Sequence, residues 1–126
     1  MKIFITGVAG FLGSHLADLM LSQGHTVAGN DNMIGGYTDN VPQDVEFHQI
    51  DCCDLENMTK AMEGCDIVYH TAATAYEGLS VFSPVLVTRN IFEASVTTIT
   101  AAIRNKVKRI VYCSSMARYG HHDDLP

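Results

Sequence analysis

Small residues at a fixed spacing near the start of the chain form the first group that can do chemistry. Gly7, Gly10 and Gly13 follow the apolar run 2–6 and open an amphipathic segment, 11–23. A strand, a tight glycine turn and a helix in this order let the backbone approach a phosphate, because the first N–H groups of the helix and the positive end of its dipole face the anion. Glycines also cap helices and make ordinary turns, so a dinucleotide site needs further support.

An acidic residue supplies that support. A second apolar run, 25–29, leads into Asn30-Asp31-Asn32. Asp31 therefore lies roughly 20 residues beyond the glycines, where dinucleotide folds keep a carboxylate for the adenosine ribose hydroxyls. Because a carboxylate repels a 2′-phosphate, the residues predict NAD rather than NADP as the cofactor.

The composition is typical of one compact domain. Of the 126 residues, 47% are hydrophobic and 17% are charged, which is enough apolar material for a buried core. The net charge of −6 and the scatter of basic and aromatic residues argue against nucleic acid and an anionic membrane surface. Neither a signal-peptide core nor an apolar run of ~20 residues is visible. We therefore expect a cytoplasmic protein that binds neither nucleic acid nor membrane.

Cysteine and histidine side chains are candidate metal ligands, but their spacing argues against a metal. Cys52, Cys53, Cys65 and Cys113 form no CxxC pair, so we expect buried, reduced thiols. The sequence His-His-Asp-Asp at 121–124 is typical of a solvated tail, and adjacent side chains rarely point at one ion. No metal site is predicted.

The elements that must position the glycines and Asp31 are strands that alternate with helical segments. Apolar runs of strand length recur at 2–6, 26–30, 45–50, 67–70 and 109–113. This alternation predicts an α/β fold, a Rossmann-type parallel sheet with helices on both faces. The right-handed crossover rule gives the strand order 3-2-1-4-5, with ligands expected at the carboxyl edge of the sheet.

The first helix, 11–23, has an apolar periodicity and a stop signal. Gly24 provides a left-handed end, and four residues at helical spacing predict the face that packs on the sheet. These residues are Leu12, Leu16, Leu19 and Met20.

Two more helices are expected. One covers 55–62 after Asp54, a good cap. The other covers 84–105, where the β-branched stretch 96–100 favours a strand locally but the distance between the fourth and fifth strands requires a crossover helix.

One short motif follows each of the five predicted strands. Together the five motifs resemble the extended short-chain dehydrogenase/reductases, specifically the NAD-dependent nucleotide-sugar epimerases and dehydratases, over the full length of the chain. The motifs are Thr6-Gly7-Val8-Ala9-Gly10-Phe11-Leu12-Gly13, Asp31-Asn32, Asp51-Cys52-Cys53-Asp54-Leu55, His70-Thr71-Ala72-Ala73 and Ser114-Ser115-Met116-Ala117-Arg118-Tyr119-Gly120.

The resemblance implies a role for each matching residue at the cofactor. The first motif would surround the pyrophosphate, the second would hold the adenosine ribose, and Asp51 and Cys52 would meet the adenine. The small residues after the fourth strand would form a wall beside the nicotinamide ribose, and an asparagine of the crossover helix is a further match. The implied cofactor-binding residues are Gly7, Gly10, Phe11, Leu12, Gly13, Asp31, Asn32, Asp51, Cys52, Thr71, Ala72, Ala73 and Asn90.

The resemblance also implies a catalytic serine. Ser115 would hydrogen-bond the sugar hydroxyl or keto oxygen, and Tyr76 lies in the loop that would face the sugar. Four of the residues in these motifs and loops also have simpler interpretations. Ser115 could be a polar group that satisfies the backbone at a strand end, and Asp51 a turn or capping residue. His70 could be a packed imidazole and Tyr76 an ordinary surface residue.

The chain departs from the family at the proton donor. The family uses a Tyr-x-x-x-Lys pair, in which the lysine lowers the phenol pKa, and none of the five tyrosines has a lysine four residues later. The resemblance places that tyrosine past Pro126, so we expect a sheet truncated before its sixth strand and no substrate domain. An uncovered fifth strand then favours association into a homo-oligomer, most simply a dimer.

The sequence therefore predicts the NAD-binding portion of a nucleotide-sugar epimerase or dehydratase. In the complete enzyme NAD would take hydride from a nucleotide-sugar substrate, a UDP-sugar by resemblance, and return it. Alone, the chain is expected to be inactive. The alternatives are a non-catalytic NAD-binding module and a structural or interaction subunit without a ligand.

Overall fold

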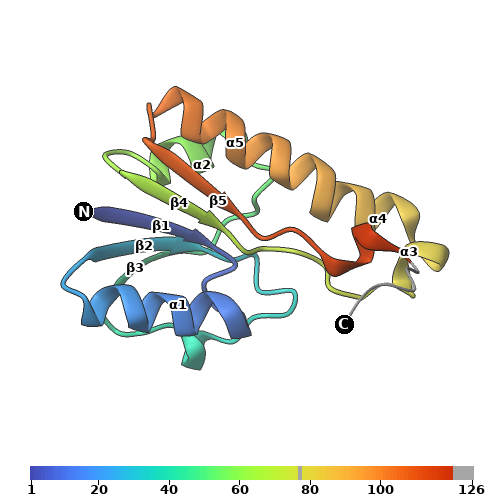
Figure 1. The fold of residues 1–126 in the computed structure, drawn as a ribbon, viewed down its shortest axis with the longest axis horizontal. Coiled ribbons are helices and arrows are strands. Elements are labelled where there is room, and N and C mark those ends of the chain that lie inside the picture. The colour runs from blue at the N-terminus through green and yellow to red at the C-terminus, as the bar shows by residue number, and fades with distance from the viewer. Residues whose placement is uncertain (77, 121–126) are drawn as a thin grey trace.

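The computed structural model of the protein describes residues 1–76 and 78–120. In these residues, five parallel strands form one sheet at the centre of the molecule (Figure 1). The strand order is β3-β2-β1-β4-β5, so the predicted order is confirmed. Every pair of neighbouring strands is parallel. The strands are β1 (Lys2–Thr6), β2 (Thr26–Asn30), β3 (Val45–His48), β4 (Ile67–His70) and β5 (Arg109–Tyr112).

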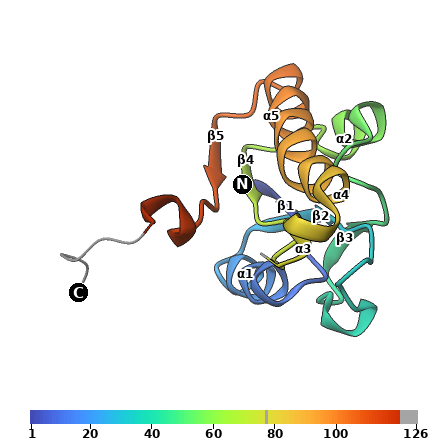
Figure 2. The ribbon, with the colours of Figure 1, turned by 90° about the vertical axis from the view of Figure 1, so that its right-hand side faces the viewer.

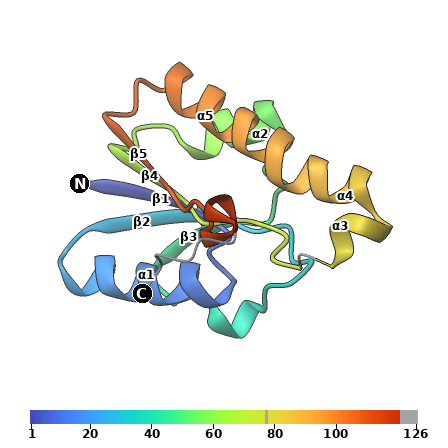
Figure 3. The same ribbon diagram turned by 45° about the vertical axis from the view of Figure 1, so that its right-hand side comes forward.

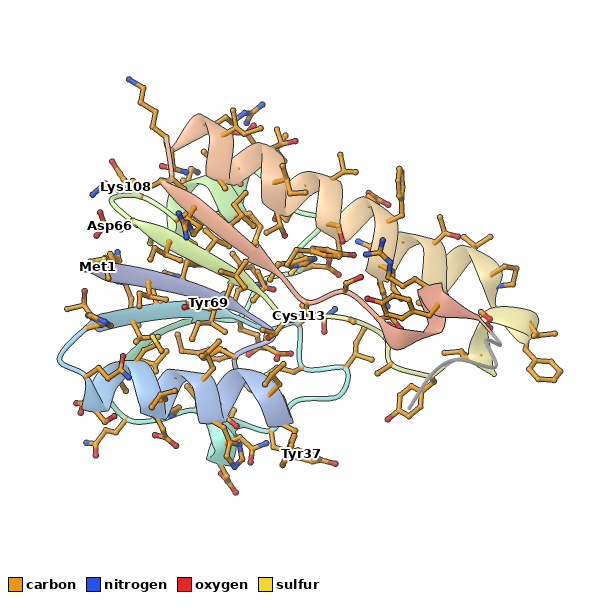
Figure 4. All side chains as sticks on the ribbon, in the orientation of Figure 1. Met1, Tyr37, Asp66, Tyr69, Lys108 and Cys113 are labelled. Atoms are coloured by element: carbon orange, nitrogen blue, oxygen red, sulfur yellow. The ribbon has the colours of Figure 1, made fainter. Side chains whose placement is uncertain are left out.

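Helices cover both faces of this sheet. Helix α1 lies on one face, and α2 and α5 lie on the other (Figure 1). Because successive strand residues point to opposite faces, β1 serves two cores: Ile3 and Ile5 belong to the cluster with α1, and Phe4 belongs to the cluster with α2 and α5. Figure 4 shows Tyr69 of β4 on the α1 side, where it packs against the first cluster. The helices are α1 (Phe11–Ser22), α2 (Leu55–Ala61), α3 (Leu79–Phe82), α4 (Pro84–Thr88) and α5 (Ala94–Arg104).

The packed face of α1 agrees with the expected one at Leu16 and Met20 and differs from it at the other two positions. Leu12 and Leu19 are 53% and 49% exposed, whereas Gly13, Ala17 and Met20 are buried. A Cβ added at Gly13 would lie 2.1 Å from the carbonyl oxygen of Gly7. The helix therefore approaches the sheet so closely that its smallest side chains must face inward, and the two leucines turn outward.

The segment 84–105 is helical, as predicted, but it is not one regular helix. A π-helical turn, Arg89–Glu93, joins α4 to α5, and Asn105 caps the end. The β-branched residues do not prevent the helix, because Thr98 and its neighbours Ala94, Ala101 and Ala102 are buried against the sheet and α2. Figure 3 shows the segment after β4 running out to α3, which packs against α4.

Other boundaries differ by one or two residues from the predicted ones. Strand β3 ends at His48 rather than at residue 50, and β5 ends at Tyr112 rather than at residue 113. Asp54 caps α2 as expected, because its carboxylate accepts a hydrogen bond from the Asn57 amide at 3.1 Å. Gly24 has φ +77° after α1. Two loops also contain short 3-10 helices, Thr38–Asn40 and Met116–Tyr119.

Strand β5 lies at the edge of the sheet and is poorly covered. Val111 and Tyr112 are partly exposed, which agrees with the predicted open edge, and the chain then runs away from the sheet (Figure 2). Cys113 is therefore exposed rather than buried, because it follows the edge strand, where none of the helices in the described part of the chain covers it. Figure 4 places Cys113 at the opposite end of the sheet from Lys108 and Asp66, which form an ion pair.

The remaining cysteines fit the prediction more closely. Cys52 and Cys65 are buried and Cys53 is half-buried, and all four cysteines are free thiols. Burial raises the pKa of Cys65 to about 11, so this thiol is inert at neutral pH. Among the described residues, no helix is long and apolar enough to cross a membrane.

Candidate functional site

The glycine turn after β1 contacts the ends of β2 and β4, the two strands that flank β1. Gly7 has φ +69°, and its N–H donates to the Asn30 carbonyl of β2 at 2.8 Å. A Cβ at Gly7 would lie 2.9 Å from Cα of Ala72, which follows β4. The turn therefore needs glycine both for its left-handed backbone and for the close approach of the next loop.

The strand register brings three loops to one edge of the sheet. Thr6 pairs with Asn30 on one side and with His70 on the other, so the loops after β1, β2 and β4 start level with one another. This edge is the carboxyl edge, at which open α/β sheets bind ligands.

A cavity of about 380 Å³ lies at this edge. Its lining includes all thirteen residues that the resemblance assigns to the cofactor, together with Tyr76. Residues far apart in the sequence, from Gly7 to Asn90, therefore share one concave surface. The lining residues that sequence reasoning missed are Asn30, Ile34, Gly35, Gly36, Thr74, Ala75 and Ala94.

Two of the missed residues carry a signal that could have found them. Asn30 is an amide at the end of an apolar strand and directly precedes Asp31. Gly36 lies so close to Asp31 that an added Cβ would be 2.9 Å from the Asp31 Oδ2 atom. Both residues lie in or directly before a loop at the carboxyl edge of the sheet, and binding residues are disproportionately found in such loops.

Asp31 lies buried in the wall beside the glycine turn. It is 8% exposed, its Oδ2 atom accepts a hydrogen bond from the Ala9 N–H at 3.1 Å, and its Oδ1 atom accepts one from the Met33 N–H at 2.8 Å. Each carboxylate oxygen can accept a second bond. The carboxylate therefore ties β2 to the glycine turn and keeps acceptor capacity on the cavity side.

Asp51 joins three segments at the other end of this wall. Its Oδ1 atom accepts a hydrogen bond from the Cys53 N–H at 2.8 Å, and its Oδ2 atom lies 3.2 Å from the Arg89 guanidinium and 3.4 Å from the Asn32 amide. Partial burial works to raise the pKa of Asp51, but these hydrogen bonds and the Arg89 charge outweigh burial and hold the pKa below its ordinary value. The simpler interpretation of Asp51 as a turn residue is thus also satisfied, since the carboxylate caps the loop while it lines the cavity.

The small residues after β4 form the opposite wall. The N–H groups of Thr71 and Ala72 both donate to the Thr6 Oγ1 atom at 3.1 Å, and the Thr71 hydroxyl donates to the Thr6 carbonyl. Asn90, in the π-helical turn, donates to the Thr74 Oγ1 atom at 3.0 Å. These bonds bring the crossover helix and the loop after β4 together over the cavity.

His70 is a packed imidazole, as its simpler interpretation predicts. It is 3% exposed, and burial lowers its pKa to about 4. The ring is therefore neutral at pH 7, and it lies below the wall rather than in the cavity lining.

The two predicted substrate residues have different positions. Tyr76 lies at the rim of the cavity and is 71% exposed. Ser115 is exposed and lies outside the described lining of the cavity, in the segment that leaves the sheet after β5 (Figure 2). The Ser115 carbonyl accepts a hydrogen bond from the Arg118 N–H in a 3-10 turn. Ser115 is therefore not among the described residues that line the cavity.

A metal centre receives no support from the described part of the chain. Within residues 1–76 and 78–120, no group of three or more His, Cys, Asp or Glu side chains is placed to hold an ion. The segment 121–124 lies outside the described residues.

The architecture and the site have counterparts in known proteins. The probable UDP-arabinose 4-epimerase 3 of Arabidopsis thaliana is 32% identical over 98% of this chain and 33% of its own length. The UDP-glucose 4-epimerase of Corynebacterium glutamicum is also 32% identical, over 100% of this chain and 38% of its own length. The chain thus spans only a third to two fifths of the curated relatives it matches.

Solved structures give the same picture. The UDP-glucose 4-epimerase of Brucella ovis in complex with NAD is 31% identical, with a TM-score of 0.94 over 99% of this chain and 39% of that chain. The UDP-glucose 4-epimerase of Thermus thermophilus in complex with NAD is 33% identical, with a TM-score of 0.87 over 91% of this chain and 38% of that chain. The profile of the NAD dependent epimerase/dehydratase family matches residues 3–126. With its sheet order, its glycine turn and its cavity as described, the chain belongs to the NAD dependent epimerase/dehydratase family.

Proposed function

We propose that this chain is the NAD-binding portion of a nucleotide-sugar epimerase that acts on a UDP-sugar. The observation that carries the proposal is the cavity at the carboxyl edge of the sheet, whose lining unites all the cofactor residues implied by the five motifs. The UDP-sugar 4-epimerases that share almost the full length of this chain support the substrate class.

The start of α1 has the chemistry that a diphosphate requires. Gly10 precedes the helix without a side-chain cap, and no acidic residue occurs in the first turn. The first N–H groups of α1 have no partner within the helix, and Gly10, Phe11 and Leu12 line the cavity. The positive end of the helix dipole therefore faces a concave surface that no carboxylate of this turn neutralises.

The remaining residues fit the rest of an NAD molecule. Asp31 and Asn32 would hold the adenosine ribose, Asp51 and Cys52 the adenine, and the wall at Ala72 the nicotinamide ribose. When bound, NAD supplies the hydride acceptor and donor. A carboxylate at Asp31 disfavours a 2′-phosphate, so NAD is proposed over NADP.

The residues of this chain would bind and orient rather than move the substrate proton. Ser115 is proposed to hydrogen-bond the sugar, and Tyr76 to contact it from the rim. The 126-residue sequence contains no Tyr-x-x-x-Lys pair. We therefore expect the chain by itself to bind NAD without converting a UDP-sugar.

Isothermal titration of the chain with NAD and NADP tests the proposal. Asp31→Asn should reduce the preference for NAD over NADP by about tenfold, the equivalent of one lost charge repulsion. Asp39→Asn is the matched control, because Asp39 is exposed in the 3-10 helix of the same loop and does not line the cavity. An equal change in both variants would contradict the role of Asp31.

Thermal unfolding separates the proposal from a ligand-free structural subunit. NAD at 100 times its Kd should stabilise the chain by about 2.7 kcal/mol. An unchanged melting temperature at millimolar NAD would favour the ligand-free alternative. Conversion of UDP-glucose by the chain alone would contradict the expected lack of turnover.

A further inference from the structure

The buried ring of His70 is hydrogen-bonded at both nitrogens. Nδ1 lies 2.8 Å from the Thr6 Oγ1 atom of β1, and Nε2 lies 3.0 Å from the Ser95 Oγ atom of α5. One imidazole therefore connects the central strand to the crossover helix.

The Thr6 hydroxyl determines which nitrogen carries the proton. Its oxygen already accepts hydrogen bonds from the N–H groups of Thr71 and Ala72. A hydroxyl has two lone pairs and one proton, so the remaining bond must be one in which Thr6 donates to His70 Nδ1. Nδ1 is therefore the unprotonated nitrogen.

The other half of the network agrees with this assignment. With Nδ1 unprotonated, Nε2 carries the proton and donates to the Ser95 Oγ atom. The Ser95 hydroxyl in turn donates to the Ile91 carbonyl at 2.5 Å. Each hydroxyl proton and ring nitrogen thus has one partner, and the whole chain of bonds has a single direction.

Both ends of this network reach residues that line the cavity. Thr71 and Ala72 are at one end, and Ala72 is the residue that crowds Gly7. At the other end, Ile91 belongs to the π-helical turn that carries Asn90, which also lines the cavity. π-helical turns occur frequently at functional sites, and here the turn is tied to the sheet through Ser95 and His70.

We propose that His70 is a positioning residue of the coenzyme site, an inference that rests on the proposed function. As a neutral ring with its proton on Nε2, it holds the Thr71 and Ala72 amides through Thr6 and the Asn90 turn through Ser95. The ring thereby fixes the Thr71–Ala72 segment relative to the Asn90 turn, in addition to the direct Asn90–Thr74 hydrogen bond at the cavity. An imidazolium cannot do this, because its Nδ1–H would face the Thr6 hydroxyl oxygen, whose two lone pairs are already in use.

Nuclear magnetic resonance of the chain labelled with 15N tests the tautomer of His70 and the direction of these hydrogen bonds without any ligand. The imidazole signals at pH 7 should show a protonated Nε2 and an unprotonated Nδ1. Thr6→Val removes the hydroxyl and should speed hydrogen exchange of the Thr71 and Ala72 amides by about tenfold or more, because each loses its acceptor. Thr6→Ser keeps the hydroxyl and should restore protection.

Coenzyme titration tests the positioning role. Thr6→Val and Ser95→Ala should each weaken NAD binding by about tenfold, whereas Thr6→Ser should stay within about twofold. Thr100→Val is the matched control, because its hydroxyl bonds the Val96 carbonyl on the exposed side of the same helix. Ser95→Ala keeps the test available if Thr6→Val does not fold.

The outcomes distinguish this inference from the proposed function. An Nδ1–H tautomer, or unchanged exchange at Thr71 and Ala72 in Thr6→Val, would overturn the inference whether or not NAD binds. Equal NAD affinity in Ser95→Ala and Thr100→Val would also overturn it. A wild-type chain that shows the expected tautomer and protection but does not bind NAD would refute the proposed function alone.

Discussion

Alanine at Gly7 and at Gly24 separates backbone strain from crowding. The two glycines have similar left-handed backbones, with φ of +69° and +77°, but only Gly7 has neighbours in reach of an added Cβ. The left-handed conformation costs an alanine about 1 kcal/mol at either site. At Gly7 the methyl group would also lie 2.9 Å from Cα and 3.0 Å from N of Ala72, which are backbone atoms that cannot rotate away.

The expected difference between the two variants follows from this crowding. Overpacking against a fixed neighbour destabilises by roughly 1–3 kcal/mol. Gly24→Ala should therefore lower the free energy of unfolding by about 1 kcal/mol and Gly7→Ala by about 2–4 kcal/mol. NAD affinity should fall only in Gly7→Ala, because only there does the cavity wall at Ala72 have to move.

Urea denaturation of both variants, with NAD titration of the folded proteins, measures these quantities. Gly13→Ala adds a test of sign, because an uncrowded glycine in a helix gains about 1 kcal/mol on substitution by alanine. The Cβ would lie 2.1 Å from the Gly7 carbonyl oxygen, so we expect destabilisation instead. Equal losses for Gly7→Ala and Gly24→Ala, or a more stable Gly13→Ala, would refute the close packing of turn, helix and wall.

Three smaller perturbations have defined outcomes. Burial lowers the pKa of His70 to about 4, so between this value and pH ~6.5 the unfolded chain binds a proton that the folded chain excludes. The free energy of unfolding should therefore have its full value above pH ~6.5 and fall by roughly 3 kcal/mol as the pH is lowered towards 4. Urea denaturation at a series of pH values measures this change. Asp54→Ala removes the cap of α2 and should lower the free energy of unfolding by about 1 kcal/mol without changing NAD affinity. Arg89→Met removes a half-exposed ion pair with Asp51, and denaturation should show a change below about 1 kcal/mol.

Local chemistry made part of the structure predictable. The glycine turn, the Asp54 cap and the Gly24 helix end depend on residues within one turn of the chain, so the sequence indicates them directly. The strand order follows from the alternation of strands and helices, because right-handed crossovers leave few topologies. The candidate cofactor residues were predicted from the family resemblance, and all thirteen of them line one cavity.

Other features escaped prediction because they depend on contacts between distant segments. The apolar periodicity of α1 indicated the packed face only in part: Leu16 and Met20 pack on the sheet, but Leu12 and Leu19 are exposed. The close approach of Gly13 to Gly7, which a local pattern does not show, helps to set the rotation of the helix. The β-branched run at 96–100 was correctly placed in a helix only because the crossover between the fourth and fifth strands requires one. The π-helical turn at Arg89–Glu93 within that helix was not predicted. Ser115 matches a family motif but is not among the described lining residues, and its role stays a prediction.

The sequence by itself determined which segments become strands, where the chain can turn tightly, and which family motifs it contains. It did so because backbone sterics and apolar periodicity act over a few residues. Only the tertiary structure decided that Asp51 meets Arg89, that Ala72 packs on Gly7, and that His70 bridges Thr6 and Ser95. Those contacts join residues brought together by the sheet register, and their strength depends on burial, which exists only once the layers have packed.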